Sequence, residues 1–139
     1  MQPAKMQYDA ELYLTLQKSL YVQWGPPHVG GMLEPLAIVA TGLLAFFMRR
    51  HRRNRWLNAG SLFALLLAFP VVFFWLVAPA NAVFASATLQ NIPSNWADMR
   101  TGWEMGHGIR FGLQFVALTL LILSLVTDAN PPAKTGLQN

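Results

Sequence analysis

The sequence predicts an all-α integral membrane protein, a helical bundle with three spanning helices and an N-terminal interfacial amphipathic helix. Of its 139 residues, 54% are hydrophobic and only 12% are charged, whereas about 25% of the residues in soluble domains are charged. Three apolar stretches are long enough for the roughly 20-residue helix that crosses a bilayer. Five of the ten Lys and Arg residues lie in one run between the first two stretches, from Arg49 to Arg55.

An amphipathic helix is expected over residues 8–24. Leu12, Leu16 and Leu20 recur at four-residue intervals, and polar character comes from Asp9, Glu11, Gln17 and Lys18. A helix with this pattern lies in the membrane interface, with its aromatic side chains at the depth of the lipid headgroups. The Gly25-Pro26-Pro27 sequence that follows is expected to end it.

The three spans are predicted over residues 29–48, 56–78 and 105–127. Glu34 lies near the start of the first span, where a carboxylate suits the positive end of the helix dipole. Pro70 lies in the middle of the second span and is expected to kink it. The third span is polar in its first half and apolar in its second. Residues 1–127 are therefore expected to form one membrane helical-bundle domain, and residues 128–139 a flexible C-terminal tail.

The distribution of positive charge predicts the topology and argues against nucleic acid as a partner. The formal net charge is +4, but an arginine run between two spans is typical of a cytoplasmic loop. The first span then runs inward and the second outward, residues 79–102 lie outside, and the third span returns the C-terminus to the cytoplasm. The expected localisation is a membrane, most simply the bacterial inner membrane, with the lipid bilayer as the surrounding partner.

Polar residues are concentrated where the third span begins. If a helix starts at Ser94 or Asn95 and continues into the span, seven side chains fall within an arc of about 120°. These residues, called the polar stripe below, are Trp96, Arg100, Trp103, Glu104, His107, Arg110 and Gln114. Charged groups are expensive to expose to lipid, so the polar stripe is expected to face the bundle interior or a water-filled cavity.

Glu104 and His107 are the candidate reactive pair, because residues three apart are neighbours on one face of a helix. Their mutual pairing, with salt bridges to Arg100 or Arg110, is the purely structural interpretation. Acid–base chemistry on a bound substrate is a second interpretation.

Metal ligation is a third interpretation of Glu104 and His107. Paired Glu-x-x-His elements hold di-iron centres in helical bundles, and this sequence has one such element. Glu34 and His28 are candidates to complete a ligand set for iron or copper, whereas a site without any cofactor is the other alternative. The chain has no cysteine, which excludes thiolate ligands and a cysteine nucleophile.

Two sequence motifs resemble a known family. Asn95-Trp96-Ala97-Asp98-Met99-Arg100, followed by Trp103-Glu104-x-x-His107-x-x-Arg110, resembles the C-terminal signature of the DUF1772, or anthrone oxygenase-like, membrane proteins. Pro79-Ala80-Asn81 after a long apolar span is also similar to that family. The resemblance covers roughly residues 11–126, and its specific part is the Trp-Glu-His-Arg spacing.

The resemblance implies a four-helix membrane bundle, and some fungal members are implicated in oxidising anthrones to anthraquinones. It implies a shared polar site made of Asn81, Trp96, Arg100, Trp103, Glu104, His107 and Arg110. The family usually begins with an apolar span, which residues 1–18 lack. Either that helix has been lost, or the numbered start is internal to a longer product. A second copy of the chain or a partner membrane subunit would then cover the open side of a three-span bundle.

Three functional hypotheses follow. The first is a membrane oxidoreductase, an oxygenase acting on a small hydrophobic or aromatic substrate, in which Glu104 and His107 move a proton and Arg100 or Arg110 stabilises an oxyanion. The candidate substrate-binding residues are Asn81, Trp96, Trp103 and Gln114. The second hypothesis is a non-catalytic structural or accessory subunit of a membrane complex, in which the polar stripe locks helices together. The third is a path for protons or small solutes.

Overall fold

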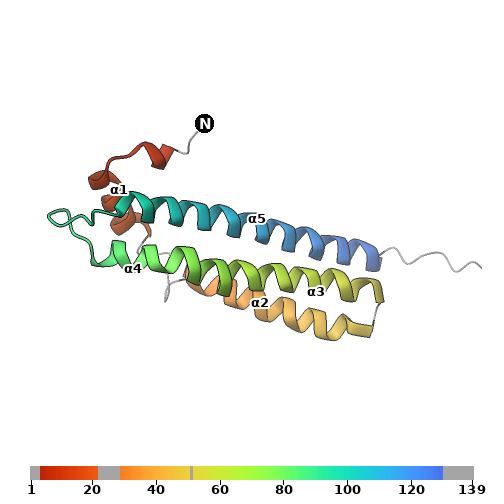
Figure 1. Ribbon diagram of the computed structural model, residues 1–139. Helices are drawn as coiled ribbons and strands as arrows, with labels where there is room; N and C mark the ends of the chain where they lie inside the picture. Colours follow the sequence, from red (N-terminus) through yellow and green to blue (C-terminus); the bar gives the residue numbers. More distant parts are fainter. Residues whose placement is uncertain (1–3, 22–28, 51, 130–139) are drawn as a thin grey trace, which may run out of the picture.

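The computed structural model describes residues 4–21, 29–50 and 52–129. Within these residues the protein is an all-α helical bundle, as predicted (Figure 1). Three helices, Val29–Arg50, Asn54–Ser86 and Trp96–Thr127, are long and apolar enough to cross a membrane. The chain therefore has the architecture of an integral membrane protein.

The N-terminal segment folds into a 3-10 turn η1 (Ala4–Gln7), a helix α1 (Ala10–Leu16) and a π-helical turn η2 (Gln17–Tyr21). Helix α1 begins after Asp9, whose side chain accepts a hydrogen bond from the backbone N–H of Leu12 at 2.8 Å, a stabilising N-cap. A helix thus occupies residues 10–21 of the predicted range, and residues 22–24 lie outside the described part of the chain. The predicted polar face is wrong in one respect, because Gln17 is buried. Leu12 and Leu20 are exposed, whereas Tyr13, Leu14 and Gln17 are buried against the bundle.

The second span is longer than predicted and changes its helical geometry twice. It comprises α3 (Arg52–Leu66), the π-helical η4 (Leu67–Val77) and α4 (Ala78–Ser86). The distortion expected at Pro70 takes the form of η4, because a wider turn accommodates a proline that lacks an N–H donor. The predicted end at residue 78 is wrong: Pro79 lies in the first turn of α4, where proline is well tolerated.

The remaining spans are α2 (Val29–Phe47), which leads into a short 3-10 turn η3 (Met48–Arg50), and α5 (Trp96–Ala129). Helix α5 begins nine residues before the predicted third span. Asp98 lies in its first turn, where a carboxylate interacts favourably with the positive end of the helix dipole. Asp128 and Ala129 belong to α5 and not to the predicted tail. Residues 130–139 lie outside the described part of the chain.

The second span is the centre of the bundle. About a third of its most apolar window (33%) is buried, compared with 6% for the first span and 11% for the third. Helix α3 packs against both α2 and α5, and η4 packs against α5. Large apolar side chains on the outer faces of α2 and α5, such as Leu36, Val39, Phe111 and Phe115, are exposed, as expected for lipid contact.

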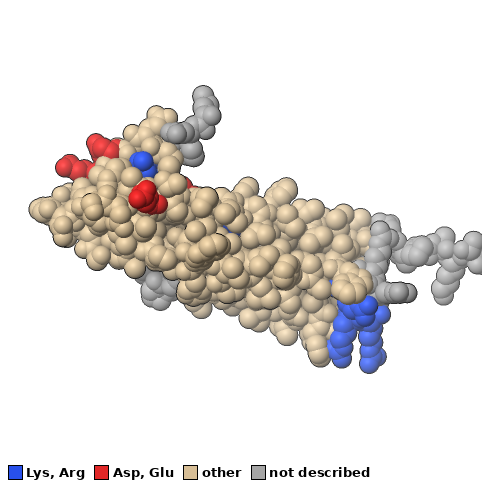
Figure 2. All heavy atoms as spheres, in the orientation of Figure 1, with Lys and Arg blue, Asp and Glu red and all other residues tan. Residues whose placement is uncertain are grey.

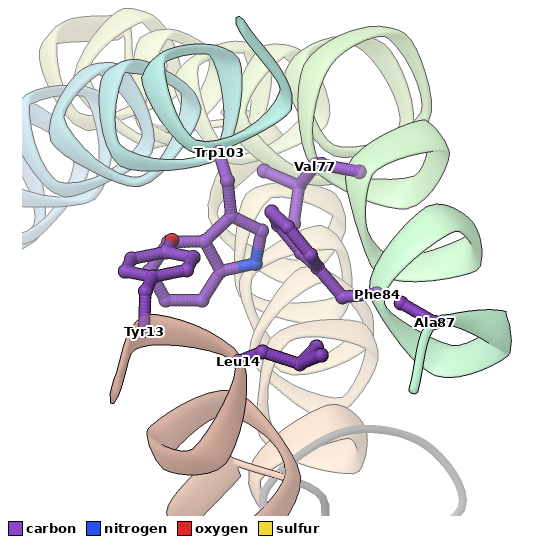
Figure 3. Close-up of a cluster of buried hydrophobic side chains, with 7 residues drawn as sticks. Tyr13, Leu14, Val77, Phe84, Ala87 and Trp103 are labelled. Atoms are coloured by element: carbon purple, nitrogen blue, oxygen red, sulfur yellow. The ribbon is translucent and has the colours of Figure 1, made fainter. Parts of the chain in front are cut away.

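Two apolar clusters hold the helices together. The larger one lies at the end of the bundle that carries the N-terminal segment. It joins α1, η4, α4 and α5 through Tyr13, Leu14, Val77, Ala80, Phe84, Ala87 and Trp103 (Figure 3). The smaller one joins α3 to α5 through Ala64, Leu65 and Ala117. Beside it, the hydroxyl of Ser61 donates a hydrogen bond to the backbone carbonyl of Ala117 at 2.9 Å.

Charge is divided between the two ends of the bundle. Figure 2 shows basic side chains projecting from the end that carries the α2–α3 loop, whereas at the opposite end acidic side chains are gathered with basic atoms among them. Arg49, Arg50 and Arg55 are exposed at the first end. The N-terminal segment and the α4–α5 loop lie at the second end (Figure 1), which also holds the candidate site.

Candidate functional site

Helix α5 carries the polar stripe on the side that faces the rest of the protein. Trp103 is 5% exposed, and Glu104, His107, Arg110 and Gln114 are partly buried. Met105, Ile109 and Phe111, on the other side of the helix, are exposed. This orientation agrees with the cost of exposing charged groups to lipid.

Trp103 is the fixed point of the site. Its Nε1–H donates a hydrogen bond to Oδ1 of Asn81 on α4 at 2.8 Å, so the indole ties α4 to α5. Its ring lies 3.9 Å from the imidazole of His107 between centroids, with the planes tilted by 33°. The ring of Tyr21 meets it edge-on at 5.3 Å.

Hydrogen-bond contacts of both ring nitrogens hold His107 in one orientation. Nδ1 lies 2.9 Å from the backbone carbonyl oxygen of Trp103, which can only accept a hydrogen bond, so Nδ1 carries the proton. Nε2 lies 3.4 Å from Nη1 of Arg110, which can only donate. Both contacts fit a neutral imidazole whose Nε2 lone pair accepts a long hydrogen bond from Arg110, a tautomer assigned from these partners. Nε2 can act as a base when that long contact is exchanged for a substrate proton.

Three polar side chains form a clamp between α2 and α5. Arg110 donates from Nη2 to Oε2 of Glu34, and Gln114 donates from Nε2 to Oε1 of the same carboxylate. The side chains of Arg110 and Glu34 are only 13% and 16% exposed. Among the described residues, the buried Nε–H of Arg110 has no hydrogen-bond partner.

Glu104 and Arg100 are bound by the N-terminal segment and not by His107. The Glu104 carboxylate lies 3.1 Å from Nζ of Lys5 and accepts a weak hydrogen bond from the Tyr13 hydroxyl at 3.5 Å. Arg100 donates to the backbone carbonyl of Tyr8 at 2.9 Å. The predicted Glu104–His107 neighbours therefore have different partners, although both lie on the inner face of α5.

Tyr13 connects Glu104 to the apolar cluster. Its hydroxyl accepts a hydrogen bond from Nε2 of Gln17 at 2.8 Å, and the residue is 1% exposed. Burial raises the pKa of the Tyr13 phenol well above its usual value of 10.0, and the nearby Glu104 carboxylate adds to this effect. Tyr13 is consequently a neutral hydrogen-bond donor across the ordinary pH range.

A cavity of about 380 Å³ opens beside Trp103 and His107. One part of its wall is aromatic, with Tyr21, Phe69, Phe73 and Trp103, and another part is polar, with Glu34, Asn81, His107 and Arg110. Pockets of this size that combine apolar walls with a few polar groups are typical of small-molecule sites. The cavity can therefore hold a small, largely apolar molecule with one polar group next to His107 and Arg110.

The three described candidates for metal ligands, Glu34, Glu104 and His107, do not form a ligand set. Among residues 4–21, 29–50 and 52–129, no group of three or more His, Asp or Glu side chains is close enough to hold a metal ion. Glu34 is bound by Arg110 and Gln114, and Glu104 by Lys5 and Tyr13. His28 lies outside the described residues. The donor set seen here does not fit iron or copper, so no step below depends on either metal.

The structure thus divides the predicted site residues into two groups. Asn81, Trp103, His107 and Arg110 line the cavity together with Glu34, and Gln114 supports Glu34. Arg100, Glu104 and Trp96 instead meet the N-terminal segment: the Trp96 ring lies 4.6 Å from the Arg100 guanidinium and 6.4 Å from the Tyr13 ring.

Sequence reasoning missed several residues of the site. Phe69 and Phe73 line the cavity from η4, and their four-residue spacing in an apolar run gives no sign of a binding role. Lys5, Tyr13 and Gln17 reach the site from the N-terminal segment. Tyr13 and Gln17 are four residues apart, which places both on one helix face. This spacing could have identified them as a hydrogen-bonded pair.

Comparisons of this chain with protein-family models, with curated proteins and with solved structures found no match. The resemblance to the anthrone oxygenase-like proteins therefore stays a prediction that rests on the motif residues alone.

Proposed function

We propose that this protein is a membrane oxidoreductase of the anthrone oxygenase-like type, which binds a small hydrophobic or aromatic substrate in the cavity beside Trp103. The observation that carries the proposal is the make-up of that cavity. An aromatic wall faces a neutral imidazole whose Nε2 makes only a long contact with Arg110, and the Arg110 guanidinium lines the cavity beside it. A substrate oxygen that becomes anionic would be stabilised by this cationic side chain.

In the proposed reaction, Nε2 of His107 removes a proton from an acidic C–H or O–H group of the substrate. The electron pair left behind moves onto the substrate oxygen, and the resulting phenolate or enolate is stabilised by Arg110. Dioxygen is the oxidant and takes electrons from this anion. Overall, a CH₂ group and O₂ are converted to a C=O group and water, and His107 returns its proton when the water is released.

The remaining site residues have supporting roles in this proposal. Asn81 fixes Trp103, and the Trp103 ring holds the imidazole of His107 from one side. Glu34 and Gln114 hold Arg110 beside the cavity. Arg100 and Glu104 anchor the N-terminal segment, which contributes Tyr21 to the cavity wall.

The proposed topology places the α2–α3 arginine loop in the cytoplasm and the cavity near the opposite face of the membrane. The positive-inside rule supports this orientation, and so does the division of charge between the two ends of the bundle. A bacterial inner membrane is the proposed location. A hydrophobic substrate would then enter the cavity from the outer leaflet.

A second function, a structural or accessory membrane subunit, is favoured by the Glu34–Arg110–Gln114 clamp. The clamp joins α2 to α5 across the bundle, and a buried ion pair of this kind can fix how helices fit together. In that case the polar stripe would hold helices in place without chemistry, and a second copy or a partner subunit would cover the exposed faces of α2 and α5.

Turnover of an anthrone by the purified protein tests the proposal. We expect wild-type protein in detergent to consume dioxygen and form the anthraquinone, and His107→Ala to lose this activity. Thr101→Ala is the matched control, because Thr101 lies on the exposed face of α5 and its hydroxyl donates a hydrogen bond to the Ala97 carbonyl of the same helix. Full turnover by His107→Ala would overturn the proposed mechanism. An inactive wild type that always copurifies with another membrane protein would favour the accessory function.

A further inference from the structure

We infer that Tyr13, Tyr21, Trp103 and Glu104 form a cage for an organic ammonium group, and that Lys5 of the same chain occupies it as an internal ligand. The cage lies on the N-terminal side of the site. It shares Tyr21 and Trp103 with the cavity wall, but it does not include His107 or Arg110. The inference goes beyond the proposed oxidoreductase function and does not depend on it.

The distances around Nζ of Lys5 define the cage. The ammonium lies 4.2 Å from the ring centroid of Tyr21, 4.3 Å from that of Trp103 and 5.8 Å from that of Tyr13. All three are within the distance of about 6 Å at which an aromatic face attracts a cation. The Glu104 carboxylate completes the cage at 3.1 Å. Aromatic faces around a cation are how proteins recognise choline and methylated lysine.

Two walls of the cage are fixed by contacts that do not involve Lys5. Trp103 is 5% exposed and is anchored by its hydrogen bond to Asn81. Tyr13 is 1% exposed and is anchored by Gln17. Figure 3 shows both rings within the apolar cluster at the N-terminal end of the bundle. A site whose walls are already in place binds its ligand without a large ordering cost.

The occupant is held much less firmly than the walls. Lys5 belongs to η1, a four-residue turn with no buried residue, and its side chain is 22% exposed. Because η1 is short and exposed, Lys5 can leave the cage without unpacking the bundle. Glu104 would then lack its cationic partner, and an external ammonium ion would replace the lost charge.

The ligand class is therefore a substituted ammonium, such as a quaternary or primary alkylammonium group. Two sources can supply this chemistry. One is the headgroup of a choline or ethanolamine lipid, since the cage lies at one end of the three candidate spans, where headgroups are found. The other is a small soluble amine.

The test uses full-length protein labelled with ¹⁵N at tryptophan, with the indole signal of Trp103 assigned through Trp103→Phe. Tetramethylammonium chloride is titrated in detergent, with sodium chloride at equal ionic strength as the reference. We expect a saturable shift of the Trp103 signal in Lys5→Ala at millimolar concentration. Wild type should bind at least about twofold more weakly, because tethered Lys5 competes at an effective concentration in the same millimolar range as the ligand.

Three further variants keep the inference testable. Lys18→Ala removes the other lysine of the N-terminal segment, which bonds the Ala85 carbonyl outside the cage, and should behave like wild type. Tyr21→Leu and Glu104→Gln, each made in the Lys5→Ala background, should weaken binding. Identical shifts with tetramethylammonium and sodium in Lys5→Ala would overturn the inference, as would undiminished binding after both of these substitutions.

Lipid nanodiscs distinguish the two sources. If a lipid headgroup is the ligand, Lys5→Ala in phosphatidylcholine discs will show the bound Trp103 signal before any addition, whereas in phosphatidylglycerol discs the signal will shift only with tetramethylammonium. If a soluble amine is the ligand, the signal will shift with tetramethylammonium in both kinds of disc. If the Trp103 signal of Lys5→Ala keeps its unbound position in both kinds of disc after tetramethylammonium is added, the inference is overturned.

Discussion

Trp103 on α5 and Asn81 on α4 are joined by a hydrogen bond of 2.8 Å between the indole Nε1–H and the amide oxygen. The two residues are separated by 22 positions and by the whole α4–α5 loop. Because the same indole packs against the imidazole of His107, this bond sets the position of the cavity wall.

Asn81→Ala should therefore destabilise the protein. The substitution removes the acceptor of the Trp103 Nε1–H, and because Asn81 is itself exposed, the cost should be about 1 kcal/mol, so the melting temperature in detergent should fall. Asn81→Asp keeps an acceptor oxygen at the same position and should recover part of the loss. An unchanged melting temperature in Asn81→Ala would show that the indole finds another partner.

Arg110→Leu should be more destabilising than His107→Ala. Removing Arg110 leaves the Glu34 carboxylate buried with only Gln114 as a partner, and breaking a buried pair in this way costs about 3–5 kcal/mol. His107 is neutral in this network, so its removal strands no full charge. Melting temperatures of both variants decide the order, and Arg110→Leu combined with Glu34→Gln should recover stability. The opposite order would contradict these roles.

Gly106 and Gly112 should respond in opposite ways to alanine. A Cβ at residue 106 would lie 2.8 Å from Cγ2 of Val77 and 3.0 Å from Cβ of Leu76, and Val77 is only 1% exposed. Gly106→Ala should cost about 1–3 kcal/mol through overpacking. Gly112 has open space around it, so Gly112→Ala should gain about 0.5–1 kcal/mol from helix propensity. Thermal unfolding of the two variants, side by side, is the measurement.

Alkaline pH should destabilise the fold through Tyr13. Its pKa in the folded protein is raised above the ordinary value of 10.0 by burial, so the folded state favours the protonated phenol. The stabilising contribution is complete below pH 10.0 and is lost as the pH rises above it. Melting temperatures between pH 8 and 11 should fall less steeply for Tyr13→Phe than for wild type. Equal slopes would contradict the assignment, and Tyr8→Phe controls for loss of a phenol.

Single-cysteine labelling tests the proposed topology, and the absence of native cysteine makes the background clean. Ser94→Cys, in the exposed α4–α5 loop, should react with a membrane-impermeant maleimide added to intact cells. Arg50→Cys, exposed at the other end of the bundle, should react only after the membrane is opened. Labelling of residue 50 in intact cells would reverse the orientation.

The spans were predictable because apolar length is a property of the sequence alone. Their ends were not, since Pro79 and the polar residues from Trp96 onward are compatible with both a loop and a helix. Pro79 lies in the first turn of α4, which begins at Ala78, and Trp96 starts α5. For Trp96, packing against Tyr13 of the N-terminal segment accompanies the helical start, a contact that the local sequence does not encode.

The inner face of α5 was predictable from helical periodicity, but the partners of its residues were not. Spacing places Glu104 beside His107, yet Lys5 and Tyr13 bind Glu104 while Trp103 and Arg110 bind His107. These partners come from the relative positions of separate helices and from the docking of α1. Neither is encoded in the local pattern of α5.

The Glu34–Arg110 pair also has a consequence for biosynthesis. The two residues are 76 positions apart in the chain, and a ribosome adds about 5–20 residues per second. Glu34 therefore leaves the ribosome about 4–15 s before its arginine exists. A carboxylate without a partner is unfavourable inside a membrane. The start of α2, which carries Glu34, should therefore stay near the membrane surface until α5 has been synthesised. Complete insertion of the first helix then depends on the last one.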